Sequence, residues 1–183
     1  DTRSSKVAIA FENKNIQFIN DVSSGFHDSN MLNTVSKLGC AFIMTHMPRE
    51  HKEGKVKVFD NILTEINEYF IERIESCKKA GIEKDKLIID PGVGFGKSGE
   101  DNITLLNNIE SLKRVHENVC VGSSNKRYSS RLFENIQTKE DLKIANLATF
   151  ATSTLANATY LRVHDVELTK DTVQVINKAM SLI

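Results

Sequence analysis

The segment KLIIDPGVGFGK, Lys86 to Lys97, decides the fold. Its first half is a short apolar run that ends in Asp90, and its second half is a loop with three alternating glycines. An unbroken apolar run is typical of a strand buried on both faces, and such strands form parallel sheets. A carboxylate at the end of a buried strand must be paired, because an unpaired one is costly. The segment therefore predicts a strand and a loop that carry a functional site.

Two familiar glycine-rich motifs fit this loop only in part. A P-loop, GxxxxGK[ST], matches at its end, but its first glycine would fall on Pro91. A dinucleotide fingerprint, GxGxxG, matches at Gly92 and Gly94, but its third glycine would fall on Lys97. A plain strand-to-helix turn would not require three glycines and a buried acid. We therefore expect a ligand site of another kind.

Similar strand-like runs occur on both sides of this segment. Each is compact, apolar and bounded by turn residues. Together the predicted strands are Gln17 to Asp21, Ala41 to His46, Lys86 to Gly92, Val119 to Ser124 and Tyr160 to Asp165. Helical patterns separate them, and strands that alternate with helices indicate an α/β fold with a parallel sheet.

The helices are predicted from apolar residues that recur every three or four positions. They are Ser4 to Asn13, Val58 to Lys79, Asn102 to Val115, Glu140 to Asn157 and Leu168 to Ala179. The charged run Arg49 to Glu53 is expected to be a solvated loop.

Polar residues stand where the predicted strands end, at Asn20, His46, Asp90, Ser124 and Arg162. A closed barrel gathers all of these ends around one site, whereas an open sheet spreads them along a crevice. We therefore predict a (β/α)8 TIM barrel. Such a barrel has eight strands and about 250 residues. The chain is expected to supply strands 4–8 and the helices after strands 3–8, as one domain over residues 1–183, with strands 1–3 missing.

Composition excludes several other classes of protein. Basic and acidic residues balance at 24 each, so no charge excess favours nucleic acid or a membrane surface. No apolar run reaches the roughly 18 residues of a spanning helix. The cysteines, Cys40, Cys77 and Cys120, are odd in number and widely spaced, which predicts free thiols in a reducing cytoplasm.

The loop DPGVGFGK resembles the DPGFGFGK signature of the dihydropteroate synthases. The likeness extends along the chain in the order of that family. The further matching segments are Asp1-Thr2, INDVSSG from Ile19 to Gly25, Thr45-His46-Met47, VGSSNK from Val121 to Lys126, and RVHD from Arg162 to Asp165. Each motif alone is weak to moderate, but six in the same order are specific.

The resemblance implies an enzyme that joins 6-hydroxymethyl-7,8-dihydropterin pyrophosphate to p-aminobenzoate, releasing pyrophosphate and making 7,8-dihydropteroate. A carboxylate can accept two hydrogen bonds from the N–H and NH₂ edge of a pterin. By the resemblance, the pterin-binding residues are Asp1, Asn20, Met47, Asp90, Lys126 and Arg162. The catalytic residues so implied are Asp1, Asp90, Lys126, Arg162 and His164.

The resemblance also assigns the other ligands. It places p-aminobenzoate, and the sulfonamides that mimic it, against Gly94, Phe95 and Lys126, and it places pyrophosphate against Arg162 and His164. It implies Mg²⁺ as the cofactor, with the metal-binding Asn upstream of this chain and no metal ligand within it. It further implies a cytoplasmic homodimer.

The chain departs from the family pattern at two loops. The usual HM-x-GTP after strand five is replaced by His46-Met47-Pro48-Arg49-Glu50, and the usual SRK is replaced by Ser124-Asn125-Lys126. Two alternatives therefore stand beside the synthase. One is a non-catalytic pterin-binding relative, and the other is a pterin methyltransferase of the methyltetrahydrofolate type, which uses a similar barrel.

Overall fold

The computed structural model describes residues 1–124 and 138–182. Its strands are all parallel and form one row. The sheet β1-β2-β3 comprises Phe18–Asp21, Ala41–Thr45 and Leu87–Asp90, and the sheet β4-β5 comprises Cys120–Val121 and Tyr160–Leu161. A bridge between Ile89 and Val119 joins the two sheets, so β3 lies beside β4. The predicted parallel α/β architecture is confirmed.

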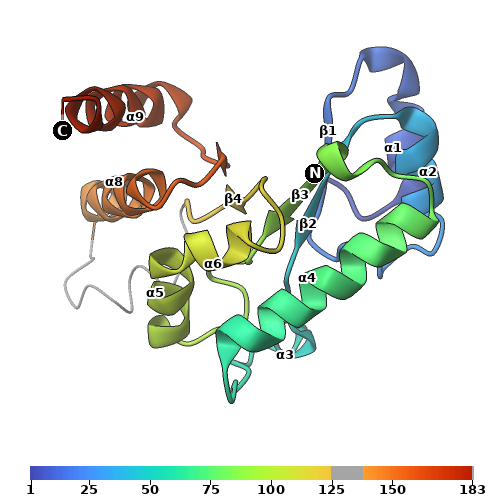
Figure 1. Ribbon diagram of the computed structural model, residues 1–183, viewed down its shortest axis with the longest axis horizontal. Helices are drawn as coiled ribbons and strands as arrows, with labels where there is room; N and C mark the ends of the chain where they lie inside the picture. Colours follow the sequence, from blue (N-terminus) through green and yellow to red (C-terminus); the bar gives the residue numbers. More distant parts are fainter. Residues whose placement is uncertain (125–137, 183) are drawn as a thin grey trace.

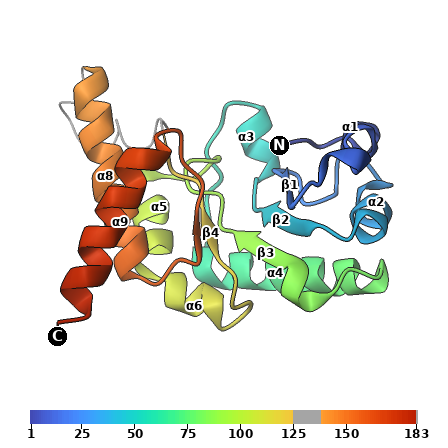
Figure 2. The same ribbon diagram turned by 90° about the horizontal axis from the view of Figure 1, so that it is seen from above.

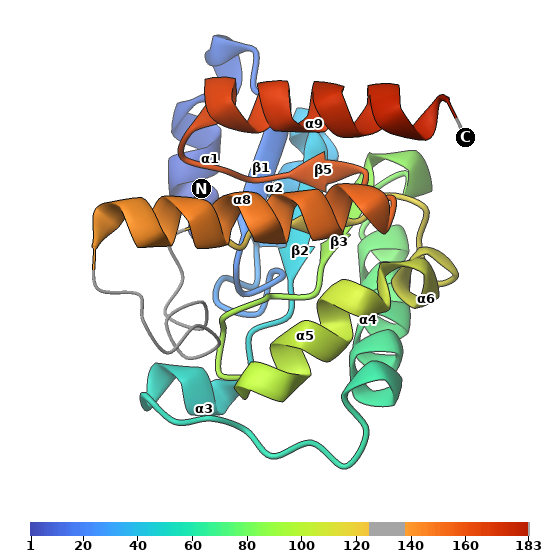
Figure 3. The same ribbon diagram turned by 90° about the vertical axis from the view of Figure 1, so that its left-hand side faces the viewer.

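The helices lie outside this row of strands (Figure 1). The α-helices of the described residues are α1 Ser5–Ala10, α2 Met31–Leu38, α3 Arg49–Lys52, α4 Ile62–Lys79, α5 Gly99–Asn107, α6 Ile109–Lys113, α8 Lys139–Leu155 and α9 Val166–Met180. Figures 1 and 2 place α1 and α2 at one end of the molecule and α8 and α9 at the other. The helices α8 and α9 pack side by side (Figure 3).

Alternation along the strands divides the core between two faces. Phe42, Met44 and Ile89 point outward into the main core beneath the helices. Ile43 and Ile88 point the other way and form a small inner cluster with Cys120. The register Ile43↔Ile88 and Thr45↔Asp90 puts each pair on the same inner face, because paired residues of parallel strands point alike.

The row of strands curves back on itself. The strands β1 and β5 stand at its two ends, yet the rings of Phe18 and Tyr160 meet edge to face with centroids 5.9 Å apart. Both rings belong to the inner face, since Phe18 lies two residues before Asn20 and Tyr160 pairs with Cys120. A flat sheet would hold its end strands far apart. The curvature is that of a barrel wall.

Several boundaries differ from the sequence predictions. The long helix begins at Ile62 rather than Val58, because Asn61 caps it by accepting from Thr64 N, and Val58 is 89% exposed. The helix predicted from Asn102 to Val115 is two helices, α5 and α6, which meet at Asn108. The run from Arg49 was wrongly predicted to be a loop, since it forms the single turn α3.

No helix in the described part of the chain combines the length and the apolar character needed to cross a membrane.

Candidate active site

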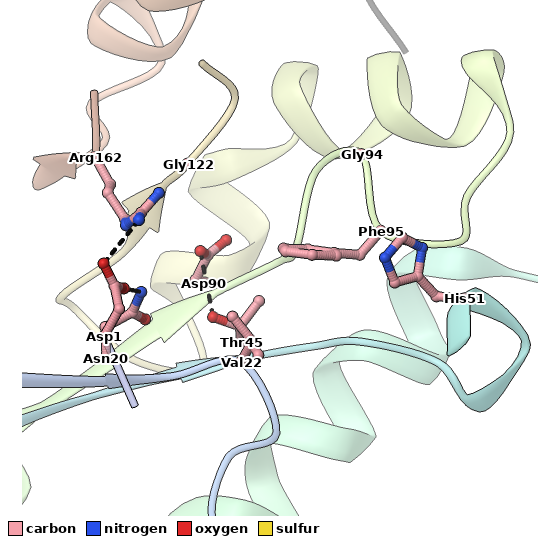
Figure 4. Close-up of a pocket in the computed structure, with 10 residues that line it drawn as sticks. All are labelled: Asp1, Asn20, Val22, Thr45, His51, Asp90, Gly94, Phe95, Gly122 and Arg162. Atoms are coloured by element: carbon pink, nitrogen blue, oxygen red, sulfur yellow. Dashed lines mark hydrogen bonds and ion pairs between the residues drawn. The ribbon is translucent and has the colours of Figure 1, made fainter. Parts of the chain in front are cut away.

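A cavity of about 510 Å³ opens at the carboxyl ends of the strands. Its walls come from all five strands or the segments that follow them, together with Asp1 at the start of the chain (Figure 4). The lining residues are Asp1, Asn20, Val22, Thr45, His51, Asp90, Gly94, Phe95, Gly122 and Arg162. Asp1, Asn20 and Arg162 stand at one side, Phe95 and His51 at the other, and Asp90 between them (Figure 4).

Asp90 is the buried acid of this cavity, with 4% of its surface exposed. Its Oδ1 accepts from Gly92 N at 2.8 Å, and its Oδ2 lies 3.4 Å from the hydroxyl of Thr45. Gly122 faces it from β4, and a Cβ there would lie 3.5 Å from Oδ2. The carboxylate is therefore held in a fixed orientation at the inner face, next to a wall that has no side chain.

Below Asp90 lies Cys120, in the inner core. Burial, reinforced by the negative charge of Asp90, raises the pKa of the Cys120 thiol. The thiol therefore stays protonated and packs as a small apolar side chain.

Asp1 forms hydrogen bonds with residues at both ends of the row of strands, Asn20 on β1 and Arg162 directly after β5. It accepts from Arg162 Nη2 at 2.8 Å, and it also accepts a hydrogen bond from Asn20 Nδ2. These bonds orient the amide of Asn20, whose Oδ1 is buried and has no hydrogen-bond partner among the described residues. An acceptor of this kind is costly to bury without a donor. Asn20 and Asp90 line the same cavity.

The loop after β3 forms the aromatic side of the cavity. Gly92, Gly94 and Gly96 all have positive φ, which only glycine adopts without strain. The ring of Phe95 meets His51 edge to face, with centroids 5.0 Å apart and planes at 89°. The turn α3 packs closely on this loop, since a Cβ at Gly96 would lie 2.9 Å from His51 Cβ.

His51 was missed in the sequence. It stands in the charged run Arg49 to Glu53, which reads as solvent-facing, and no strand or repeat marks it. Val22, Thr45 and Gly122 were also missed as lining residues. The register Thr45↔Asp90 could have identified Thr45, because it puts the two side chains on one face.

Two predicted site residues, Met47 and His164, do not line this cavity, and a third cannot be placed. Met47 lines a neighbouring cavity of about 510 Å³ together with His46. His164 lines a smaller one of about 170 Å³, where its Nδ1 lies 2.8 Å from the hydroxyl of Ser124. Lys126 lies outside the described residues. The predicted roles of these three residues stay predictions.

His46 is neutral at the end of β2. Burial, with the positive charges of Lys97 and Lys57, lowers the pKa of its imidazole to about 2. Its ring meets Tyr69 edge to face at 4.8 Å. An imidazole with this pKa packs as an aromatic ring and does not carry a charge at neutral pH.

No group of three or more His, Cys, Asp or Glu side chains suited to a metal ion occurs in residues 1–124 and 138–182.

Comparison with known proteins identifies relatives of this chain. Residues 1–164 match the family model described as "Pterin binding enzyme". The dihydropteroate synthase of Escherichia coli K12 is 32% identical over 164 residues, which cover 89% of this chain and 57% of that protein. The dihydropteroate synthase of Mycobacterium leprae is 28% identical over 182 residues, 96% of this chain and 64% of that protein. The chain thus spans about three fifths of the length of these relatives.

Solved structures agree with the sequence relatives. Xanthomonas albilineans dihydropteroate synthase with 4-aminobenzoic acid superposes with a TM-score of 0.91 at 31% identity, covering 100% of this chain and 67% of that one. The same enzyme in complex with 7,8-dihydropteroate gives 0.89 at 31% identity, covering 98% and 65%. The curved row of five strands is thus part of a TIM barrel, as predicted. The chain belongs to the family of pterin binding enzymes.

Proposed function

We propose that the protein is a dihydropteroate synthase. It would join 6-hydroxymethyl-7,8-dihydropterin pyrophosphate to p-aminobenzoate, giving 7,8-dihydropteroate and pyrophosphate. Membership of the pterin-binding family supports this proposal, as do relatives of that name. Because the chain spans only about three fifths of the length of those relatives, the activity is proposed for a protein that also contains the rest of the barrel.

One observation carries the proposal. The carboxylate of Asp90 and the side-chain amide of Asn20 line the same cavity, and Asn20 Oδ1 is an acceptor without a hydrogen-bond partner among the described residues. Two acceptors in one cavity favour a ligand that has several N–H donors along one edge. A carboxylate can bind such an edge through two parallel hydrogen bonds. A pterin presents an amino group next to a ring N–H. The cavity of about 510 Å³ has room for such a bicyclic ring.

The second substrate would lie at the aromatic side of the cavity. Gly94 and Phe95 line that side, with His51 behind the ring of Phe95. An aromatic face of this kind suits the ring of p-aminobenzoate or of a sulfonamide, because aromatic rings pack favourably face to edge or offset. Lys126, which lies outside the described residues, is proposed to contact both substrates.

The proposed reaction is a substitution at the pterin CH₂ carbon. The aniline nitrogen forms the new C–N bond, the C–O bond to pyrophosphate breaks, and the aniline gives up one proton. In a dissociative route the pterin carries positive charge as the C–O bond breaks. Asp90 and Asp1 would stabilise that charge, and Arg162 would stabilise the departing pyrophosphate. His164 is proposed to bind the pyrophosphate from its own small cavity.

We place Mg²⁺ with the pyrophosphate substrate, since the described residues hold no cluster of metal ligands. No step above depends on a metal held by these residues.

The complete protein is proposed to close the barrel with three further βα units. Among the described strands, β1 pairs only with β2 and β5 only with β4, so each leaves one edge unpaired. The backbone N–H of Thr2 donates to Asn20 O at 3.0 Å, next to β1, where an adjoining strand would end. We further propose that the protein is a cytoplasmic homodimer. The three buried free cysteines are consistent with a reducing compartment.

A turnover assay tests the function. The complete protein is incubated with the pterin pyrophosphate, p-aminobenzoate and Mg²⁺, and dihydropteroate and pyrophosphate are measured. Equal amounts of both products are expected, with inhibition by a sulfonamide that competes with p-aminobenzoate. Pterin binding without product would instead identify a non-catalytic relative.

A further inference from the structure

Lys97 is a buried lysine that the site described above does not use. Only 3% of its surface is exposed. Its Nζ donates to three backbone carbonyls, those of His46 at 3.0 Å, Gly92 at 2.9 Å and Phe95 at 3.2 Å. An ammonium has three N–H donors and no acceptor. The three donors of Lys97 are therefore matched by three carbonyls of the main chain.

These carbonyls come from two parts of the molecule. His46 follows the end of β2, while Gly92 and Phe95 belong to the loop after β3. Regular strand pairing stops at Thr45 and Asp90, and beyond it only His46 N continues the pattern by donating to Asp90 O. Three carbonyl dipoles that converge on one point repel one another unless a cation lies between them. Lys97 supplies that cation and so ties the loop to β2.

The loop packs so closely on the segment after β2 that Gly92 has no room for a side chain. A Cβ at Gly92 would lie 2.0 Å from His46 O and 3.2 Å from Lys97 Nζ. On the other side of the loop, Asn102 Oδ1 accepts from Gly94 N at 2.7 Å. The segment that carries Gly94 and Phe95 is thus held by Lys97 through its carbonyls and by Asn102 through an N–H group.

We propose that Lys97 is a positioning residue for the aromatic side of the cavity. Its ammonium fixes the loop so that Phe95 lines the cavity and Gly92 N stays on Asp90 Oδ1. This role differs from that of a P-loop lysine, because Lys97 does not line the cavity and donates to its own chain. The expected change in p-aminobenzoate binding rests on the proposed function, whereas the position of the loop does not.

Kinetics of the variants Lys97→Met and Lys97→Ala in the complete protein test the proposal. The KM for p-aminobenzoate should rise on the order of 10- to 100-fold, because misplacing a binding wall by about 1 Å has effects of that size. The affinity for the pterin should change less, because Asp90 loses at most its bond from Gly92 N and keeps the contact of its Oδ2 with Thr45 on β2. The matched control is Lys113→Met, which removes an ammonium that donates to one carbonyl, Asn157 O, away from the cavity. Its kinetics should equal those of the wild type.

Chemical rescue distinguishes positioning from a general loss of packing. Lys97→Ala leaves a space the length of a propyl group that ends at three carbonyls. Added n-propylammonium should restore part of the lost p-aminobenzoate affinity, whereas tetramethylammonium at the same ionic strength, which has no N–H donor, should not. Equal effects of the two ions, or wild-type kinetics for Lys97→Met at a temperature where it is folded, would overturn the proposal.

A second measurement does not depend on turnover, and its first part needs only the wild-type protein. In the wild-type protein, the ammonium protons of Lys97 should exchange slowly enough to give a ¹⁵Nζ correlation by NMR at neutral pH. Where Lys97→Met folds, the amides of Gly94 and Phe95 should exchange faster with solvent than in the wild type. Rapid ammonium exchange in the wild type would contradict the three hydrogen bonds from Lys97 to backbone carbonyls. A wild-type protein that shows no turnover but slow ammonium exchange at Lys97 would count against the proposed function alone.

Discussion

At the scale of single residues, the site depends on a few backbone positions as much as on its acids. Gly92 has φ +69°, and its missing Cβ leaves room for the carbonyl of His46. Asp90 in turn depends on Gly92, whose N–H holds Oδ1. Gly92 and Gly96 are therefore required because the DPGVGFGK loop closely approaches the segment from His46 to His51, a contact that a simple turn would not make.

Gly92→Ala should destabilise the protein by more than about 3 kcal/mol, because left-handed strain of roughly 1–2 kcal/mol is added to a clash with backbone. The matched control is Gly54→Ala, where φ is +73° but nothing lies within 4 Å of the added Cβ. It should cost only the strain, about 1 kcal/mol. Denaturant unfolding measures both, and equal losses would show that the contact with His46 is not as tight as described.

His46 makes stability depend on pH. Its pKa is lowered from 6.5 to about 2 by burial, so between these values the unfolded chain binds a proton that the folded chain does not. Stability should therefore fall as pH drops below 6.5, by up to about 1.4 kcal/mol per pH unit from this group. In His46→Leu the loss between pH 7 and pH 5 should be smaller by about 2 kcal/mol. An unchanged pH profile of unfolding would show that His46 can be protonated in the folded state.

At this scale, six of the site residues predicted from the sequence line the cavity, while their roles stay predictions. They are Asp1, Asn20, Asp90, Gly94, Phe95 and Arg162. The sequence did not predict the neighbours that hold them. Lys97 was recognised only as part of a motif, since its three carbonyl partners are backbone groups that the sequence does not display. His51 was missed because its position depends on how α3 folds back on the loop.

At the scale of elements, the strand order and most helices followed from apolar patterns, but the ends of the elements did not. β4 and β5 are paired over only two residues each, although the apolar runs are longer. Gly122 and Arg162, which follow the paired residues, line the cavity. Around β4 the residues from Val119 to Ser124 are all buried, so burial there extends beyond the strand pairing that the apolar pattern was taken to indicate.

The helix α5 connects local capping to the site. Ser98 and Asp101 form a capping box, and the helix carries Asn102, which holds Gly94 N. Ser98→Ala should lower stability by about 1 kcal/mol and also weaken p-aminobenzoate binding several-fold.

Thr138→Ala is the control for that change, because Thr138 and Asp141 form the same box on α8, whose cap does not line the cavity. It should cost a similar free energy of unfolding and leave ligand binding unchanged. If both variants bind p-aminobenzoate as the wild type does, the N-terminus of α5 does not set the position of the loop.

At the scale of the whole molecule, the row of strands brings distant parts of the chain to one cavity. Asp1 and Arg162 stand 161 positions apart and form an ion pair at 2.8 Å. Because both are partly exposed, the pair adds little to stability. Its contribution is to orient Asn20, which lines the same cavity as Asp90. The inner core below them is small, which is consistent with a barrel that other strands complete.

The central claim is that the acceptors Asp90 and Asn20 bind the N–H edge of a pterin, and calorimetry with the complete protein tests it most directly. The wild type should bind a pterin, and Asp90→Asn should weaken binding at least tenfold, since a charge-assisted hydrogen bond contributes about 1.5–3 kcal/mol. Its thermal unfolding temperature should change little. An Asp90→Asn variant with the pterin dissociation constant of the wild type would contradict the account.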